Sequence, residues 1–316
     1  MENMLSSQLE EKLQQLKAKF DLKGQSLEAY LDGLLVSDYL KYWDYINLDA
    51  LLNLQHPRTN YPDEKTFIIY HQITELYFRL IRNAMELIAD NPSPTANDFI
   101  KYFTRINNYF RHLTESFGMM YHGMDREQFL AFRMALMPAS GFQSAQYRII
   151  EIYSTDLIQL VSNDKREQLK NENSFELLLK NLYWKNGATE IETGKKTLTL
   201  IQFEEKYDTE FLHLAEAWQN KNLRKKYLAM SDADRNNAEV ISLLKEFDQL
   251  ANVHWPMIHF RTAARYMDRK PNEIPATGGT NWKKYLAPKN QHVIFFPELW
   301  TEEEKNNWGV GAVEGN

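Results

Sequence analysis

The sequence predicts an all-α protein, folded as a single helical-bundle domain over residues 1–316. Apolar residues recur at steps of three and four along most of the chain, which is the periodicity of amphipathic helices. No internal repeat, low-complexity block or clear linker divides the sequence. Hydrophobic residues make up 43% and charged residues 25% of the chain, a balance typical of a soluble globular protein with a substantial core.

The N-terminal segment predicts a helix that packs on a partner. Its apolar residues form a narrow stripe: Leu5, Leu9, Leu13, Leu16 and Phe20. Because a narrow stripe on a charged helix suits a helix–helix contact, we expect residues 1–25 to take part in subunit contacts. A second helix is expected from Ser26 to Tyr39, followed by the polar and aromatic segment YWDYINLDALLNLQ.

The strongest helical pattern covers Asp63 to Ala89 and stops at the turn signal Asn91-Pro92-Ser93-Pro94. Its residues form two stripes. The first stripe is Ile69, Ile73, Leu76, Leu80 and Ala84. The second stripe is Phe67, His71, Thr74 and Phe78. A helix with two such stripes is expected to be buried on two sides.

The rest of the chain predicts further helices and one irregular region. Helices are expected at 96–119, 126–136, 143–161, 202–219 and 232–267. Pro256 should kink the last of these, because proline cannot donate a helical hydrogen bond. Residues 163–200 are polar and weakly periodic, so we expect a surface excursion there. A minor β excursion is expected near residues 190–201, where Lys196 to Ile201 alternate in polarity.

Composition excludes several classes of function. A net charge of −6 without a long basic run argues against a nucleic-acid or anionic-membrane surface. The absence of cysteine excludes disulfides, zinc–thiolate sites, thiolate-ligated haem and cysteine nucleophiles, and it fits a reducing compartment. The N-terminus is too polar for a signal peptide, and no apolar stretch is long enough to span a bilayer. We therefore expect a cytoplasmic protein.

Two of the eight histidines stand out. His71 lies within the stripe of Phe67, Thr74 and Phe78, so a polar group interrupts an aromatic wall. His259 lies four residues after Trp255 on the same helix face, next to the kink expected at Pro256. Each could be a buried imidazole bonded to a carbonyl. Alternatively, His259 could be an axial ligand of a haem iron. His71 and Glu75 could also share a zinc or non-haem iron ion, although no HExxH motif or Glu-x-x-His partner accompanies them.

Two further segments contain candidate site residues: the region from Arg133 to Gly141 and the glycine pair near Thr277. Arg133 shares a helix face with Phe129, Leu136 and Met137, where it could snorkel to water or hold a carboxylate with its guanidinium fork. Ser140 could cap a helix or serve a site, and Gly141 allows the close approach of a ligand. The segment Thr277-Gly278-Gly279-Thr280 could be a plain turn or a flap over a polar ligand.

Together these segments resemble the tryptophan 2,3-dioxygenase family. Five motifs occur in the family's order between about Tyr42 and Trp300: YWDYINLDALLNLQ, FIIYHQITELYFRLI, QFLAFRMALMPASGFQSAQYR, HWPMIHFRTAARY, and ATGGT followed by YL. The chain departs from the family at Ala276, where the family has glycine, and the spacing from Arg265 to Thr277 is longer.

The resemblance implies a role for each matching residue. His259 would be the axial ligand of haem b, with Trp255, Ser140 and Gly141 beside the cofactor. His71 would be the catalytic distal histidine, which binds the indole N–H. The implied substrate-binding residues are Phe67, Phe129, Arg133 for the carboxylate, Thr277, and Tyr42 and Tyr45 lent by a neighbouring subunit of a homotetramer.

The resemblance also implies an activity. It is the haem-dependent cleavage of the indole ring of L-tryptophan by O2, which gives N-formyl-L-kynurenine in the first step of the kynurenine pathway. Three alternatives stay open from the sequence: a related haem indole monooxygenase, a non-catalytic haem- or indole-binding protein, and a helical interaction protein.

Overall fold

The computed structural model describes residues 6–37, 41–136, 141–189, 195–267 and 288–310. It confirms the all-α prediction, because 75% of these described residues are helical. Within these ranges β pairing is limited to two isolated bridges, Val161 with Leu182 and Thr189 with Lys196. The chain divides into two compact units, Met1–His56 and Pro57–Asn316. The single domain expected from the sequence stays a prediction. No helix in the described ranges is long and apolar enough to cross a membrane.

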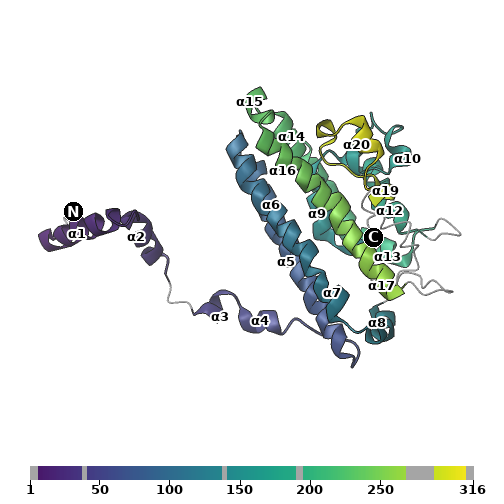
Figure 1. Ribbon diagram of the computed structural model, residues 1–316, viewed down its shortest axis with the longest axis horizontal. Helices are drawn as coiled ribbons and strands as arrows, with labels where there is room; N and C mark the ends of the chain where they lie inside the picture. The colour runs from purple at the N-terminus through teal and green to yellow at the C-terminus, as the bar shows by residue number, and fades with distance from the viewer. Residues whose placement is uncertain (1–5, 38–40, 137–140, 190–194, 268–287, 311–316) are drawn as a thin grey trace. The chain divides into compact units, whose positions relative to one another are not determined.

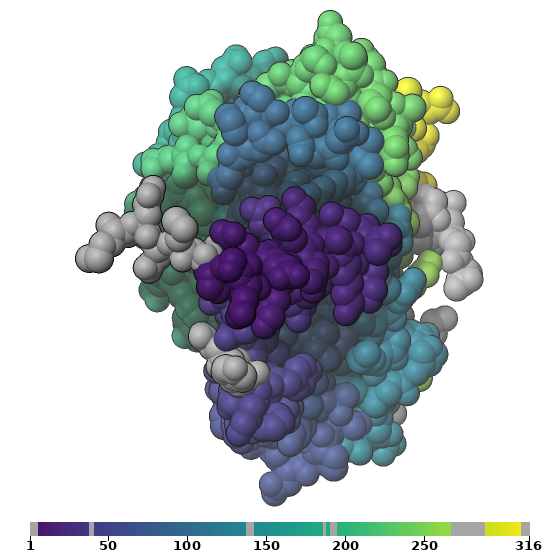
Figure 2. Space-filling view, turned by 90° about the vertical axis from the view of Figure 1, so that its left-hand side faces the viewer, coloured from purple at the N-terminus to yellow at the C-terminus, as the bar shows by residue number. Residues whose placement is uncertain are grey.

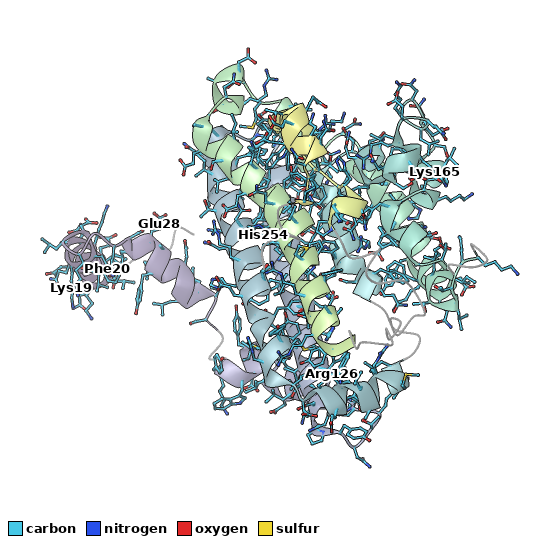
Figure 3. The ribbon with its side chains drawn as sticks, turned by 45° about the vertical axis from the view of Figure 1, so that its right-hand side comes forward. Lys19, Phe20, Glu28, Arg126, Lys165 and His254 are labelled. Carbon is cyan, nitrogen blue, oxygen red and sulfur yellow. The ribbon has the colours of Figure 1, made fainter. Side chains whose placement is uncertain are left out.

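The first unit consists of short helices with little core of their own. They are α1 (Ser7–Asp21), α2 (Leu27–Leu35), α3 (Tyr42–Tyr45) and α4 (Leu48–Leu52). None of their residues is buried, and the main aromatic contact joins Phe20 to Tyr30 at 5.2 Å between ring centroids. Figure 2 shows the exposed surface of α1 and α2 in purple, and Figure 3 labels Phe20. A segment without buried residues forms a separate unit because it contributes nothing to the main core.

Long helices form the bundle of the second unit, in which α5 packs on α6 and α9, and α6 packs on α16 (Figure 1). The long helices are α5 (Pro62–Asp90), α6 (Ala96–Ser116), α9 (Ala145–Ser154), α13 (Leu198–Trp218), α16 (Ala238–Gln249) and α17 (Trp255–Met267). Helix α6 begins with a capping box between Thr95 and Asp98. Its buried residues Phe99, Phe103 and Phe110 recur at helical spacing, so a single face enters the core.

Helix α5 confirms one of its two predicted stripes and corrects the other. In the stripe that contains Thr74 and Phe78, these two residues are buried in the core, whereas Phe67 is half-buried and His71 is exposed at the cavity. The other stripe is largely exposed in the isolated chain, where its apolar face continues to the end of the helix. The exposed residues are Ile69, Leu76, Leu80 and Leu87. The prediction that α5 is buried on two sides is therefore wrong for the single chain.

Shorter helical segments connect the bundle. They are α7 (Gly118–Gly123), α8 (Arg126–Phe132), η1 (Arg133–Leu136), η2 (Gly141–Gln143), η3 (Leu157–Leu160), α10 (Asn163–Arg166), α11 (Phe175–Lys180), α12 (Tyr183–Gly187), α14 (Leu223–Leu228), α15 (Asp232–Arg235), η4 (Leu250–His254), α19 (Pro288–Gln291), η5 (Pro297–Leu299) and α20 (Glu302–Asn306). Several helices that the sequence predicted as continuous are therefore interrupted.

Two predictions for residues 163–200 are wrong. The segment is not a surface excursion throughout, because Leu178, Leu182 and Trp184 are buried in the main core. The alternating residues 196–201 do not form a strand either. Helix α13 begins at Leu198, and the Thr197 hydroxyl caps it by accepting a hydrogen bond from Leu200 N–H. The local cap and the burial of Leu200 outweigh the weak alternation.

Asp248 attaches the C-terminal segment to α16. Its carboxylate is fully buried and accepts hydrogen bonds from the backbone N–H groups of Phe295 and Phe296, at 2.6 and 3.1 Å, and from Trp300 Nε1, at 3.0 Å. Asn252 Nδ2 donates a fourth, at 3.1 Å. Burial raises the pKa of Asp248 to about 7, against the opposing effect of these hydrogen bonds.

Replacing Asp248 with asparagine is expected to lower the free energy of unfolding by about 2–5 kcal/mol, because one carboxylate oxygen becomes an NH2 group that cannot accept its hydrogen bonds. The loss should be larger at pH 5 than at pH 8. The pKa of Asp248 is higher in the folded protein than in the unfolded chain. Its contribution to the free energy of unfolding therefore falls as pH rises from about 4 to about 7. Urea unfolding at both pH values measures this, with the exposed Asp164→Asn as control. Equal stability of the two variants would contradict it.

Candidate functional site

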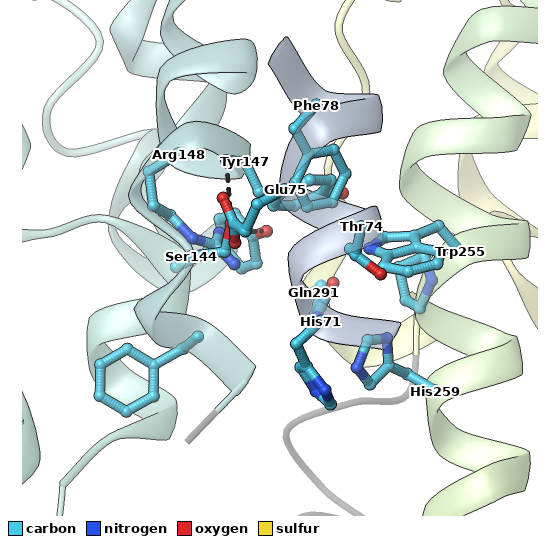
Figure 4. A pocket seen from close by; sticks show the side chains of 13 residues that line it. His71, Thr74, Glu75, Phe78, Ser144, Tyr147, Arg148, Trp255, His259 and Gln291 are labelled. Carbon is cyan, nitrogen blue, oxygen red and sulfur yellow. Dashed lines mark hydrogen bonds between the residues drawn. The ribbon is translucent and has the colours of Figure 1, made fainter. Parts of the chain in front are cut away.

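A cavity in the second unit brings together residues from α5, α9 and α17 (Figure 4). Its volume is about 700 Å³ when the open mouth is included. The cavity is lined mainly by aromatic and apolar surface, with a few polar groups, which is the usual composition of a small-molecule site. The lining residues are His71, Thr74, Glu75, Phe78, Phe142, Ser144, Tyr147, Arg148, Tyr183, Trp255, Pro256, His259 and Gln291.

His259 enters the cavity from α17, between two aromatic rings. The ring of Trp255 lies 4.9 Å away and that of Phe117 lies 4.6 Å away, both edge-on. Burial, with a smaller effect from nearby His71, lowers the pKa of His259 to about 3, so the imidazole is neutral at pH 7. Among the described residues, none forms a hydrogen bond with its ring. No carbonyl group of the described residues therefore binds the His259 ring. A nitrogen of this ring keeps a lone pair that could bind a metal.

His71 enters the same cavity from α5 (Figure 4). Its Nδ1 lies 2.7 Å from the carbonyl oxygen of Phe67. Because a carbonyl oxygen can only accept a hydrogen bond, Nδ1 carries the proton and Nε2 is left as an acceptor. Burial lowers the pKa of His71, and the hydrogen bond to Phe67 and the charge of Glu75 oppose this shift only in part. His71 therefore offers a neutral acceptor nitrogen to a ligand N–H group.

An aromatic cluster adjoins His71. The ring of Phe67 lies 4.0 Å from that of His71, and Phe129 lies 6.3 Å from Phe67. Phe132 lies 5.8 Å from Phe67 and completes the cluster. The structure thus brings together three of the predicted site residues, although Phe67 and Phe129 are not among those that line the cavity itself.

Arg133 follows this cluster directly as the first residue of η1. Its side chain is 3% exposed, so it does not snorkel to water as one interpretation of the sequence required. Burial lowers the pKa of the guanidinium, which means that the charge is held away from solvent. A buried cation next to an aromatic cluster is suited to an anionic ligand group.

Several predicted site residues are exposed or lie elsewhere. Ser140 and Thr277 fall outside the described residues. Gly141 begins η2, whose next residue, Phe142, lines the cavity. Tyr42 and Tyr45 lie on α3 of the first unit, where their side chains are 70% and 73% exposed.

Sequence reasoning missed a buried network at the cavity wall. Arg148 Nη1 donates to both carboxylate oxygens of Glu151, at 2.9 and 2.8 Å, and the hydroxyl of Tyr183 donates to Glu151 at 2.5 Å. Burial raises the pKa of Glu151, while Arg148 acts in the opposite direction. The spacing of Arg148 and Glu151 on one helix was a usable signal. Tyr183 gave no such signal, since it lies in the polar region expected at the surface.

The comparisons with known proteins identify the family of the chain. A family model described as tryptophan 2,3-dioxygenase matches residues 33–193. The chain is 26% identical over 297 residues to "Tryptophan 2,3-dioxygenase 1" of Ralstonia nicotianae, covering 88% of this chain and 92% of that protein. It is 29% identical over 273 residues to the tryptophan 2,3-dioxygenase of Ruegeria pomeroyi, covering 83% and 91%. The tryptophan 2,3-dioxygenase of Ralstonia pickettii is 27% identical over 286 residues, covering 86% and 94%.

Proposed function

Because the chain belongs to the tryptophan 2,3-dioxygenase family, we propose that it opens the indole ring of L-tryptophan with O2. The product is N-formyl-L-kynurenine, formed in the first step of tryptophan catabolism by the kynurenine route. One observation of the structure carries the proposal: His71 and His259, both neutral at pH 7, enter a single largely apolar cavity from two helices. One imidazole is suited to hold a metal-bearing cofactor and the other to bind a substrate N–H group.

The family implies haem b, and the cavity residues fit it. His259 provides a neutral imidazole, its ring engaged by no hydrogen bond from the described part of the chain. The aromatic walls suit a flat, largely apolar group. We propose that His259 would bind the haem iron, with Trp255 beside it, and that Ser140 and Gly141 would adjoin the cofactor as the resemblance implies. When bound, the haem would supply the activation of O2.

A non-haem metal fits these residues less well. The described residues contain no group of three or more His, Cys, Asp or Glu side chains that could hold an ion. A site built on His71 and Glu75 would therefore lack a third protein ligand there, whereas a haem needs only one.

The side chains would bind and orient the substrate. His71 Nε2 would accept a hydrogen bond from the indole N–H, and Phe67 would pack against the indole ring. This orientation lowers the barrier by holding the reacting carbon atoms in place, and it requires no strong base. The remaining contacts proposed from the resemblance are Phe129, Arg133 to the carboxylate, Thr277, and Tyr42 and Tyr45 from a neighbouring subunit.

Product analysis with ¹⁸O2 and L-tryptophan tests this function. We expect N-formyl-L-kynurenine that carries two labelled oxygen atoms. A product with one labelled atom would identify an indole monooxygenase instead. A haem protein that consumes no O2 in the presence of tryptophan would be a binding protein, and purified protein without a Soret band after haem supply would point to an interaction protein.

We also propose a homotetramer. The exposed apolar stripe of α5, formed by Ile69, Leu76, Leu80 and Leu87, and the exposed leucines of α1 are suited to contacts between copies of the chain. Sedimentation should give a tetramer, and replacing Leu76 and Leu80 with glutamate should dissociate it. Because tyrosines of a neighbour would complete the site, dissociation should also lower kcat/KM. A fully active monomer would contradict the proposal.

The proposed reaction needs no nucleic-acid or membrane partner. We propose a cytoplasmic location, because a chain without cysteine is compatible with a reducing compartment. Fractionation of cells that produce the full chain would test this location.

A further inference from the structure

Four residues recur at a constant interval along the helical segment formed by α16, η4 and α17. Phe247, Ala251, Trp255 and His259 follow one another at intervals of four. In an α-helix each such interval turns the face by about 40°, so over three intervals the face would drift by about 120°. Nevertheless, the first three are buried and His259 faces the cavity. A wider turn between α16 and α17 would offset this drift.

The π-helical turn η4 provides this wider turn. The N–H of Trp255 donates to the carbonyl oxygen of Leu250, five residues earlier instead of four. The extra residue rotates α17 by about 100° relative to a continuous α-helix. Figure 3 labels His254, the exposed residue of this turn. The turn η4 therefore sets the rotation of α17, and with it the directions of Trp255 and His259.

The next hydrogen bond of η4 cannot form within the helix. In the same register the donor would be the N–H of residue 256 and the acceptor would be the carbonyl oxygen of Ala251. Residue 256 is proline, which has no N–H. Ala251 is fully buried, and a buried carbonyl that lacks a donor is costly. The hydroxyl of Tyr147, from α9, donates to this oxygen at 2.8 Å.

The Tyr147 ring is itself held in place. It is buried, its centroid lies 5.4 Å from that of Phe78, and the Arg148 guanidinium lies 4.9 Å from it. Phe78 in turn contacts the ring of Trp255 edge-on, at 5.8 Å. This packing includes Trp255, the first residue of α17, and it directs the Tyr147 hydroxyl toward the carbonyl oxygen of Ala251.

We propose that Tyr147 is a positioning residue for the haem ligand. Its hydroxyl replaces the N–H that Pro256 lacks and holds η4 in the register that directs Trp255 and His259 into the cavity. The part of this inference that concerns haem rests on the proposed function, in which His259 binds the iron. The part that concerns η4 rests on the hydrogen bond alone.

Tyr147→Phe tests the inference because it removes the hydroxyl and keeps the ring. Transfer of haem from the holoprotein to apomyoglobin should become about 5- to 30-fold faster, the effect expected for one lost buried hydrogen bond. In haem-free protein, amide exchange in residues 250–257 should accelerate to a similar extent. Tyr153→Phe is the matched control, since Tyr153 is also buried on α9 but its hydroxyl contacts Glu86.

A second substitution makes the test specific. Pro256→Ala restores an N–H that can donate within the helix, so the effect of Tyr147→Phe should largely disappear in that background. Unchanged haem transfer and exchange in Tyr147→Phe, or an equal effect with and without Pro256, would overturn the inference. If the wild-type chain bound no haem, the proposed function would fail. The exchange measurements, made without haem, would still decide whether Tyr147 holds η4.

Discussion

Replacing His259 with alanine is expected to abolish tight haem binding. Its imidazole is the proposed ligand of the haem iron, and burial keeps it neutral, with a pKa of about 3. Loss of a residue that only supports a ligand typically lowers metal affinity by about 10- to 100-fold, so loss of the ligand itself should exceed about 100-fold. The measurement is the haem content of the purified variant and its ferric absorption spectrum. Added imidazole should restore part of the spectrum by occupying the position of the lost ring.

Two other histidine substitutions separate ligation from catalysis. His71→Ala should retain haem and lose turnover, because His71 is assigned to the substrate. His112→Ala should change neither property, since this side chain is 65% exposed on α6. If His259→Ala retained full haem with an unchanged spectrum, the iron would be held by another residue.

Periodicity predicted α5 and α6 well because one buried face dominates each of them. Helices α5 and α6 differ by no more than a few residues from the sequence prediction, since Pro62 and the Thr95 cap fix their starts. The widened turn at η4 was not predicted beyond a kink at Pro256. The intervals of four from Phe247 to His259 were at most a weak signal, because in a regular α-helix each of them turns the face by about 40°.

The site was only partly predictable for a different reason. His71 and His259 lie on helices whose faces the sequence shows, so their convergence could be expected. Tyr183 reaches the cavity from a short segment that is too irregular for periodicity to reveal its burial. The partners of Asp248 lie in the C-terminal segment, which no local pattern connects to α16. Such contacts depend on tertiary packing and not on local sequence.

The assignment of Arg133 to the substrate carboxylate depends on the environment of its charge. The side chain is 3% exposed and directly follows Phe132, which belongs to the aromatic cluster around Phe67 and His71. Burial lowers the pKa of the guanidinium because water is excluded from the charge. A substrate carboxylate would stabilise that charge through a bidentate, charge-assisted hydrogen bond.

Arg133→Leu is therefore expected to lower kcat/KM for L-tryptophan by roughly 30-fold to several thousand-fold, since truncating one side of a desolvated charge pair costs about 2–5 kcal/mol. Haem content should not change. Tryptamine, which lacks the carboxylate, should be a poor substrate of the wild-type protein and should lose much less on the same substitution. The exposed Arg105→Leu on α6 is the control for removal of an arginine. Equal losses for the two substrates would mean that Arg133 supports the fold or the haem, and that another group binds the carboxylate.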